Sequence, residues 1–237
     1  MTGMTTRRDF LRVLGIGGAL TIFPGLFAAC ADTGNYREIA GPGSGNAIRI
    51  DFADGDIAVL QFAYLIEQLE SDFHRQVVAS FASSTLSPTE RSVLADIASH
   101  DAIHREVLKT LLGVNASFTL TPAYDNVDMN DRASVLRTAT ALKELSVGAY
   151  NGLAQYLTDA NTVLLFGKIV SVEARHAAAI RDLIDPRSGN FASLAFDDAL
   201  GPDAIRSIVQ RYVVDRIVLA APSAMFVQGP NGSGSPS

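Results

Sequence analysis

The chain has 237 residues, which is enough for one domain with appendages and for a core that needs no disulfide bonds. Apolar residues make up 48% and charged residues 19% of the sequence, which excludes a wholly disordered or a collagen-like chain. The formal net charge of −6 leaves no basic surplus to neutralise phosphates, so nucleic acid is not an expected partner. The single cysteine, Cys30, excludes an internal disulfide framework and a cysteine-rich zinc module.

Residues 1–30 have the pattern of an export signal. Arg7 and Arg8 stand before a Phe-Leu pair and a weakly apolar, glycine-rich run over residues 13–29, an order typical of twin-arginine signals. The run is interrupted by Pro24 and is short for a membrane-spanning helix, which needs about 20 apolar residues. We therefore expect export by the twin-arginine route, with the mature protein periplasmic or attached to the envelope.

Two interpretations of the end of the signal stay open. Cleavage after Ala31 would leave a soluble protein without any cysteine. Alternatively, the Phe-Ala-Ala-Cys sequence that ends at Cys30 resembles a lipoprotein box and would make this cysteine a lipidated N-terminus. The position of the single cysteine favours the second interpretation. Contact with a membrane is expected only through the signal or such a lipid anchor.

The rest of the chain divides into a linker, a helical domain over residues 54–185 and an extension. Residues 31–53 are rich in glycine and polar residues and are expected to form a linker or irregular arm. Hydrophobic periodicity predicts four helices, over about residues 54–82, 88–112, 130–158 and 162–184. Residues 186–237 form the extension, with a short helix predicted near 203–215 and a disordered tail over 229–237.

Cap signals are clearest at the second helix. Ser87 is the expected N-cap, Pro88 the first helical residue and Glu90 the reciprocal partner in a capping box. Asn130 or Asp131 is the expected start of the third helix. These local signals separate the second and third helices from the segments that precede them.

The connections between the helices predict the topology. Short links join the first helix to the second and the third to the fourth, so each pair is expected to form an antiparallel hairpin. The 17 residues 113–129 contain Pro122 and lack a helical period. They can span the length of a bundle at about 3.3 Å per residue. The predicted fold class is therefore all-α, a four-helix bundle of two antiparallel hairpins joined by a long crossover, with a C-terminal extension.

Each predicted helix places a carboxylate in the middle of its inward apolar stripe, where aliphatic residues are expected. The second and fourth helices add a histidine three residues after the carboxylate. These central residues are Glu67, Asp101, His104, Glu144, Glu173 and His176. Buried carboxylates and imidazoles are costly unless they are paired or bound to a metal.

The repeated pattern bears on whether these residues are ligands or ordinary core residues. A lone histidine on an apolar face is more often a hydrogen-bonded core residue than a metal ligand. Two carboxylate–histidine pairs that lie 72 residues apart are harder to attribute to chance, and Glu67 and Glu144 are 77 residues apart. We interpret the chain as an approximate twofold repeat of a ligand-bearing hairpin.

The ligand set predicts the chemistry of the site. Four carboxylates and two imidazoles can hold two cations, with bridging carboxylates and one histidine on each metal. An oxygen-rich set without thiolates favours iron or manganese over zinc. The expected cofactors are therefore two iron or manganese ions, and the metal ions are the expected partners. Iron oxidation, peroxide removal and oxygen-dependent oxidation all lie within the reach of such a centre, and whether the protein is an enzyme is left open.

Four segments carry a resemblance to a known family, namely residues 56–67, 98–106, 144–150 and 172–176. They resemble the ferritin-like superfamily, and within it the branch of bacterial envelope and plant desiccation-related proteins with one ferritin-like domain. The resemblance covers about residues 54–185, and Glu173-Ala-Arg-His176, with a Gly-Ala-Tyr segment before it, is its most specific part. It implies a ferritin-like four-helix bundle and the same six central residues as metal ligands.

Some positions depart from the family pattern. Asp101 stands where the family usually has a glutamate, and His74 where many relatives have a tyrosine. Glu70 could replace Glu67 as the ligand of the first helix. Glu70, His74 and Tyr150 are therefore candidates for hydrogen-bonding or substitute roles beside the metals.

Two functions of different classes are compatible with the sequence. The first is an exported protein with a di-iron or di-manganese carboxylate centre that handles iron or reactive oxygen under stress. The second is a metal-free structural or stress-protective envelope bundle whose polar core is a network of ion pairs. In a third, less favoured interpretation, the extension over residues 186–237 binds a partner. A homodimer through the bundle faces is compatible with each of them.

Overall fold

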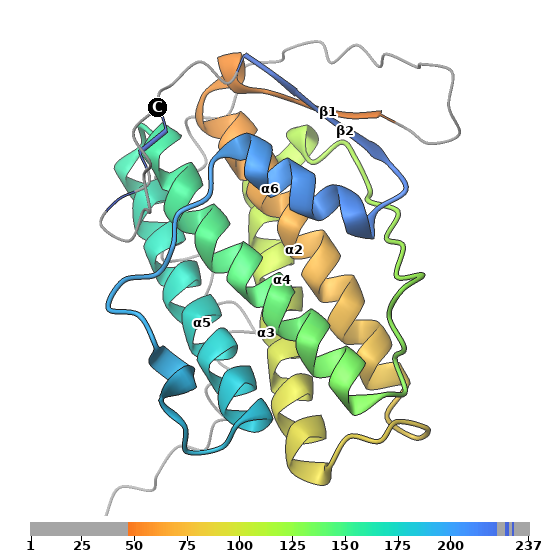
Figure 1. Cartoon of the computed structure of the whole chain (residues 1–237). Helices are drawn as coiled ribbons and strands as arrows, with labels where there is room; N and C mark the ends of the chain where they lie inside the picture. The colour runs from red at the N-terminus through yellow and green to blue at the C-terminus, as the bar shows by residue number, and fades with distance from the viewer. Residues whose placement is uncertain (1–46, 222–225, 228, 230–237) are drawn as a thin grey trace, which may run out of the picture. The chain divides into compact units, whose positions relative to one another are not determined.

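The computed structural model describes residues 47–221, 226, 227 and 229, and these residues are mostly helical. The expected signal with Cys30, most of the expected linker and the tail from residue 230 lie outside the described residues. No helix within the described part of the chain combines the length and apolar character needed to cross a membrane. Four long helices dominate the molecule (Figure 1). Their bounds are Asp56–Ala79 (α2), Pro88–Leu112 (α3), Arg132–Leu153 (α4) and Ala160–Ile184 (α5).

Side-chain caps define the N-terminal ends of α3, α4 and α5. Ser87 and Glu90 form the expected capping box at the start of α3. Asp131 caps α4 and Asp159 caps α5, and each accepts a hydrogen bond from the backbone N–H three residues later. Three of the four helix starts are therefore determined by residues adjacent to them in the sequence.

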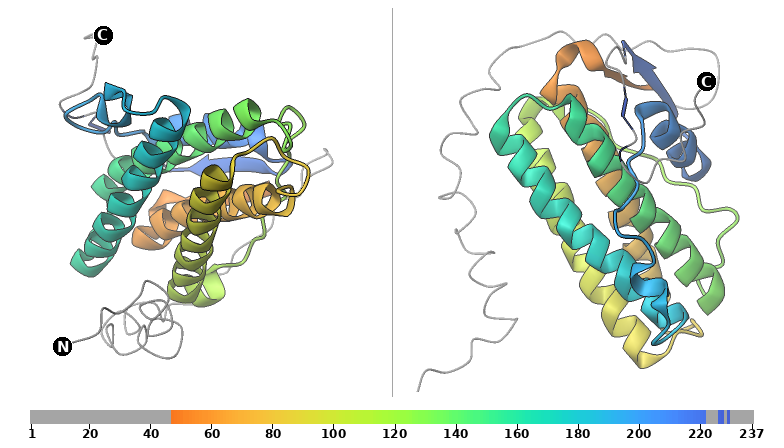
Figure 2. Two further views of the ribbon diagram at one scale, coloured as in Figure 1. Left: turned by 90° about the horizontal axis from the view of Figure 1, so that it is seen from below. Right: turned by 60° about the vertical axis from the view of Figure 1, so that its left-hand side comes forward.

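The helices pair as the short links predict, with α2 against α3 and α4 against α5 (Figures 1 and 2). The long crossover from α3 to α4 runs beside α2 (Figure 1). The Phe118 ring packs against that of Tyr64, with their centroids 5.7 Å apart, and the Tyr124 hydroxyl donates to the Leu69 carbonyl at 3.0 Å. Because the crossover covers its outer side, α2 is buried continuously over residues 58–71. The predicted four-helix bundle of two hairpins joined by a long crossover is confirmed.

The extension folds back onto the bundle through a helix and a strand. The helix α6, Pro202–Val209, overlaps the first half of the short-helix region predicted near 203–215. The strand β2, Arg216–Ala220, pairs in parallel with β1, Ala47–Asp51, from the end of the expected linker. Ile48 lies opposite Ile217 in this two-stranded sheet, and both side chains are buried. The last residues of the expected linker are therefore part of the folded domain.

Two glycines of α4 allow the extension to approach the bundle closely. The Leu200 N–H donates to the Gly148 carbonyl at 2.8 Å, and a Cβ at Gly152 would overlap the Leu200 carbonyl oxygen. On the same side of α4, the Asn151 side chain donates to the Asp198 carbonyl at 3.0 Å. This face of α4 is therefore occupied by the extension and not by the interior of the bundle.

Candidate metal centre

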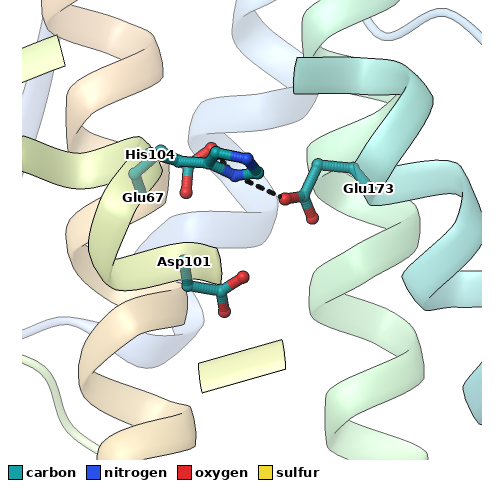
Figure 3. A group of neighbouring side chains, drawn as sticks. All are labelled: Glu67, Asp101, His104 and Glu173. Carbon is teal, nitrogen blue, oxygen red and sulfur yellow. Dashed lines mark ion pairs between the residues drawn. The ribbon is translucent and has the colours of Figure 1, made fainter. Parts of the chain in front are cut away.

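The middle sections of the long helices enclose a group of acidic and imidazole side chains. Four residues each offer one ligand atom to this group, and these atoms all lie within 4.8 Å of one another. They are Glu67 of α2, Asp101 and His104 of α3, and Glu173 of α5 (Figure 3). The three carboxylates are fully buried, whereas the His104 side chain is 13% exposed. Four of the six predicted ligands thus meet at one place.

The contribution of α4 to this group is a lysine. The Lys143 Nζ lies 2.6 Å from Asp101 Oδ1 and 2.6 Å from Glu173 Oε2, and it donates a hydrogen bond to each oxygen. A third carboxylate oxygen, Glu70 Oε1, lies 3.2 Å from the same nitrogen. The lysine side chain is fully buried. The centre therefore contains a positive charge that the sequence analysis did not predict.

Glu144 does not reach the centre, so its expected place on the inward face of α4 is wrong. Its side chain is 49% exposed and accepts a hydrogen bond from Arg181 of α5 at 2.9 Å. The expected inward stripe also contained Gly148 and Asn151, which contact the extension. The inward face of α4 is the one that carries Lys143, one residue earlier in the chain.

The three residues predicted for supporting roles lie in or beside the centre. His74 Nδ1 lies 2.7 Å from Asp101 Oδ2 and donates to this carboxylate. The Tyr150 hydroxyl donates to Glu67 Oε1 at 2.7 Å. Glu70 is fully buried with its Oε1 beside Lys143 Nζ, whereas Glu67 is the residue of α2 that belongs to the group of converging ligand atoms. The hydrogen bonds from His74 and Tyr150 fix the orientation of two candidate ligands.

His176, the remaining predicted ligand, lies at the edge of the centre. Its Nδ1 is 3.6 Å from Glu173 Oε2, and its Nε2 is 2.9 Å from Nδ1 of His100, against which the ring is stacked. Burial lowers the pKa of both His100 and His176, which favours neutral rings that share one N–H···N hydrogen bond. His100 and His104 are partly exposed, so the centre is closest to solvent along this histidine edge between α3 and α5.

Lys143 divides the buried carboxyls into two pairs. Burial alone would lower the pKa of Lys143, but the charges of Asp101 and Glu173 raise it well above its usual value. Burial alone would raise the pKa of Asp101 and Glu173, yet the lysine charge holds both below their usual values. Burial raises the pKa of Glu67 and Glu70 well above the usual value, and the lysine charge offsets the rise at Glu70 only in part. The pair bonded to Lys143 is therefore ionised, and the other pair favours the protonated form.

Several buried polar atoms of the centre have no hydrogen-bond partner. They are Glu67 Oε2, both Glu70 carboxylate oxygens, His74 Nε2, His104 Nδ1, Glu173 Oε1 and His176 Nδ1. His104 Nδ1 lies 2.9 Å from Glu173 Oε1 and 3.7 Å from the Glu67 carboxylate, without the alignment of a hydrogen bond. Unpartnered buried atoms are costly, and a cation bound by them would satisfy them. The residues present therefore fit a metal ion with carboxylate and imidazole ligands.

Lys143 and His100 are the residues that the sequence analysis missed. Lys143 precedes Tyr150 by seven residues, or about two helical turns, so the two share one face of α4. Because Tyr150 was predicted to lie beside the metals, Lys143 on the same face of α4 could have been predicted to lie there as well. His100 carried no comparable signal, because it lies beside the inward stripe of α3 and meets His176 only through the packing of α3 near α5.

The fold and the centre define a class of protein, a four-helix bundle that encloses carboxylates and histidines able to hold metal. The sequence matches the Ferritin-like domain family over residues 55–186, more than half of the chain. The protein belongs to this family. The match begins just before α2 and ends just after α5, so it coincides with the bundle and leaves out α6 and both strands. Comparison with curated proteins gave no match.

Proposed function

We propose that the protein binds iron or manganese at the buried centre and handles iron or reactive oxygen under stress, outside the bacterial inner membrane. The observation that carries this proposal is the convergence of unpartnered ligand atoms from Glu67, His104 and Glu173. Membership of the ferritin-like family supports it, because bundles of this class hold metal between glutamates and Glu-x-x-His pairs of facing helices.

The donor atoms and their surroundings support a redox-active metal. Carboxylates with one imidazole, and no thiolate, suit iron or manganese. Either ion would supply electron exchange with oxygen or peroxide when bound. Tyr150 and His74 hold Glu67 and Asp101 in place, and burial excludes bulk water from the carboxylates. The partly exposed His104 lies at the edge between α3 and α5, where the group is nearest to solvent.

The predicted export signal supports a role in the envelope. A twin-arginine signal over residues 1–30 would direct a folded protein across the membrane, so metal could be loaded in the cytoplasm before export. The cleaved form and the form lipidated at Cys30 would both place the bundle outside the inner membrane. The location therefore fits a protein that meets iron or oxidants before they enter the cell.

A second candidate function is favoured by Lys143. Its hydrogen bonds to Asp101 and Glu173 form a buried ion-pair network that involves no metal. A metal-free, stress-protective bundle would use this network as part of its stable core. Breaking a buried ion pair by removing one partner costs about 3–5 kcal/mol. In such a protein, the combined Glu173→Ala and His176→Ala variant would lose about that much stability.

Metal content, measured by plasma mass spectrometry on protein purified without chelators, tests the two functions. The wild-type chain is expected to carry stoichiometric iron or manganese. Loss of a residue that only orients a metal ligand typically weakens metal binding by about 10–100-fold. Because Glu67→Gln removes the charge of a ligand itself, it is expected to weaken metal binding by about 100-fold or more. Glu144→Gln is the matched control, because this carboxylate lies outside the centre beside Arg181, and it is expected to bind metal like the wild type. No bound metal in any of the three proteins would favour the metal-free function.

A further inference from the structure

Lys143 has the surroundings of a bound cation. Its Nζ is 2.6 Å from both Asp101 Oδ1 and Glu173 Oε2, and Glu70 Oε1 is 3.2 Å away. The helices α2, α3 and α5 thus each supply one carboxylate to the lysine of α4. Oxygen ligands that converge from several helices are the surroundings that a metal ion has in bundles of this class.

The Glu173 carboxylate divides the centre into two halves. Its Oε2 accepts a hydrogen bond from Lys143, and its Oε1 faces His104 Nδ1 at 2.9 Å. Glu173 Oε1, His104 Nδ1 and Glu67 Oε2 have no hydrogen-bond partners. One half is therefore filled by the lysine ammonium, whereas the other half presents ligand atoms that are free for a metal ion.

We propose that the centre holds one metal ion per chain and that the Lys143 ammonium takes the place of a second ion. This inference rests on the proposed metal-binding function and narrows it, because the ligand set read from the sequence predicts two ions. A protonated lysine has three donors and no lone pair, so it cannot act as a metal ligand. Its charge also repels a second cation placed on the same carboxylate oxygens of Asp101 and Glu173.

The charge balance of the centre agrees with a single ion. Four fully buried carboxylates surround it, namely Glu67, Glu70, Asp101 and Glu173. With all four carboxylates ionised, because metal binding displaces protons, Lys143 and one divalent cation would leave a small negative excess on these groups. A second divalent cation would leave net positive charge in a buried site. Glutamate in place of Lys143 would make the centre more negative by two units, which equals the charge of one more divalent cation.

A Mn²⁺ titration of the full chain, after removal of bound metal, tests the proposal. Metal content and electron paramagnetic resonance are the two readouts. The wild type is expected to saturate at one ion per chain with the spectrum of a magnetically isolated ion. Lys143→Glu is expected to saturate at two ions per chain with the spectrum of a coupled pair. Lys109→Glu makes the same change of charge on the exposed surface of α3 and is expected to stay at one ion.

The outcomes separate this proposal from the proposed function. Two ions per wild-type chain, or a coupled spectrum from the wild type, would overturn the single-ion centre and leave the metal function intact. One ion in a folded Lys143→Glu variant would overturn it as well. No bound metal in the wild type would overturn the metal function itself, and the single-ion centre with it. If circular dichroism shows that Lys143→Glu is unfolded, the wild-type stoichiometry and spectrum decide.

Discussion

The two hairpins of the bundle have the same ligand spacing, but their first helices, α2 and α4, bring opposite charges to the centre. The helices α3 and α5 each present a carboxylate and, three residues later, a histidine. Their partner helices differ, because α2 directs Glu67 and Glu70 to the centre whereas α4 directs Lys143 there. A repeat in spacing therefore does not imply a repeat in charge. In the proposed centre, one hairpin supplies most of the metal ligands and the other supplies a built-in counter-charge.

The hairpins also differ in what covers their outer sides. The crossover covers α2 with the aromatic side chains of Phe118 and Tyr124. The extension covers α4 through a backbone contact, where Leu200 meets Gly148 and Gly152. Side chains can shift to accommodate a small change in volume, whereas two backbones in contact cannot. We therefore expect the cover of α4 to be more sensitive to added atoms than the cover of α2.

Among single substitutions in the cover of the bundle, that of Gly152 is expected to have the largest effect on stability. In Gly152→Ala the new Cβ would overlap the Leu200 carbonyl oxygen, so the free energy of unfolding should fall by about 1–3 kcal/mol. Gly167→Ala in α5 is the matched control, because a Cβ there meets no atom within 4 Å. Alanine should stabilise that helix position by about 0.5–1 kcal/mol. Urea denaturation compares the variants, and an unchanged stability of Gly152→Ala would contradict the backbone contact between the extension and α4.

The bundle could be predicted from the sequence, whereas part of its cover could not. Apolar periodicity and cap residues such as Ser87 and Asp131 are local signals, so the helices and their starts follow from neighbouring residues. The helix α6 was predicted for the same reason. The strand over Ala47–Asp51 was missed because five residues give a weak pattern and its partner, Arg216–Ala220, lies near the other end of the chain.

The centre could be predicted for α2, α3 and α5 but not for α4. A carboxylate and a histidine at a spacing of three residues are recognisable within one helix. Lys143 was missed because lysine is almost never fully buried without a partner, and its partners come from three other helices. Glu144 was chosen for its charge, although its stripe contains Arg137 and Asn151, whose polarity is typical of a face outside the core.

Removal of the Tyr150 hydroxyl tests the connection between the two hairpins, because this group of α4 donates a hydrogen bond to a candidate ligand of α2. In the wild type the Tyr150 hydroxyl donates to Glu67 Oε1 at 2.7 Å, and Tyr150→Phe leaves this buried oxygen without a donor. We expect metal affinity to fall about 10–100-fold and stability by about 1 kcal/mol. Tyr124→Phe removes a hydroxyl that donates to the Leu69 carbonyl outside the centre, and it should lower stability alone. Competition with a metal-binding dye measures affinity, and equal affinities of the two variants would contradict a role for Tyr150 in holding Glu67.

The two hairpins are also joined by an ion pair at one end of the bundle. Glu90 of α3 accepts a hydrogen bond from the Ser87 N–H at 2.8 Å and one from Arg132 of α4 at 2.6 Å. Burial alone would raise the pKa of Glu90, but these hydrogen bonds lower it below its ordinary value of 4.5. A carboxyl with a lowered pKa stabilises the fold fully above the unfolded-state value. That stabilisation is lost as the pH falls through the folded-state value.

Glu90→Gln is expected to have the smallest effect and one that depends on pH. At pH 7 the variant loses the charged contact to Arg132 but keeps a side-chain oxygen for the capping box, so its stability should fall by about 1 kcal/mol or less. As the pH is lowered from 4.5, Glu90 of the wild type becomes protonated, and the difference between the two proteins should shrink. Urea denaturation across this pH range measures the difference, with Glu106→Gln as a control on the exposed surface of α3. A difference that stays constant with pH would mean that the charge of Glu90 does not stabilise the junction between the hairpins, and that its shape alone caps α3.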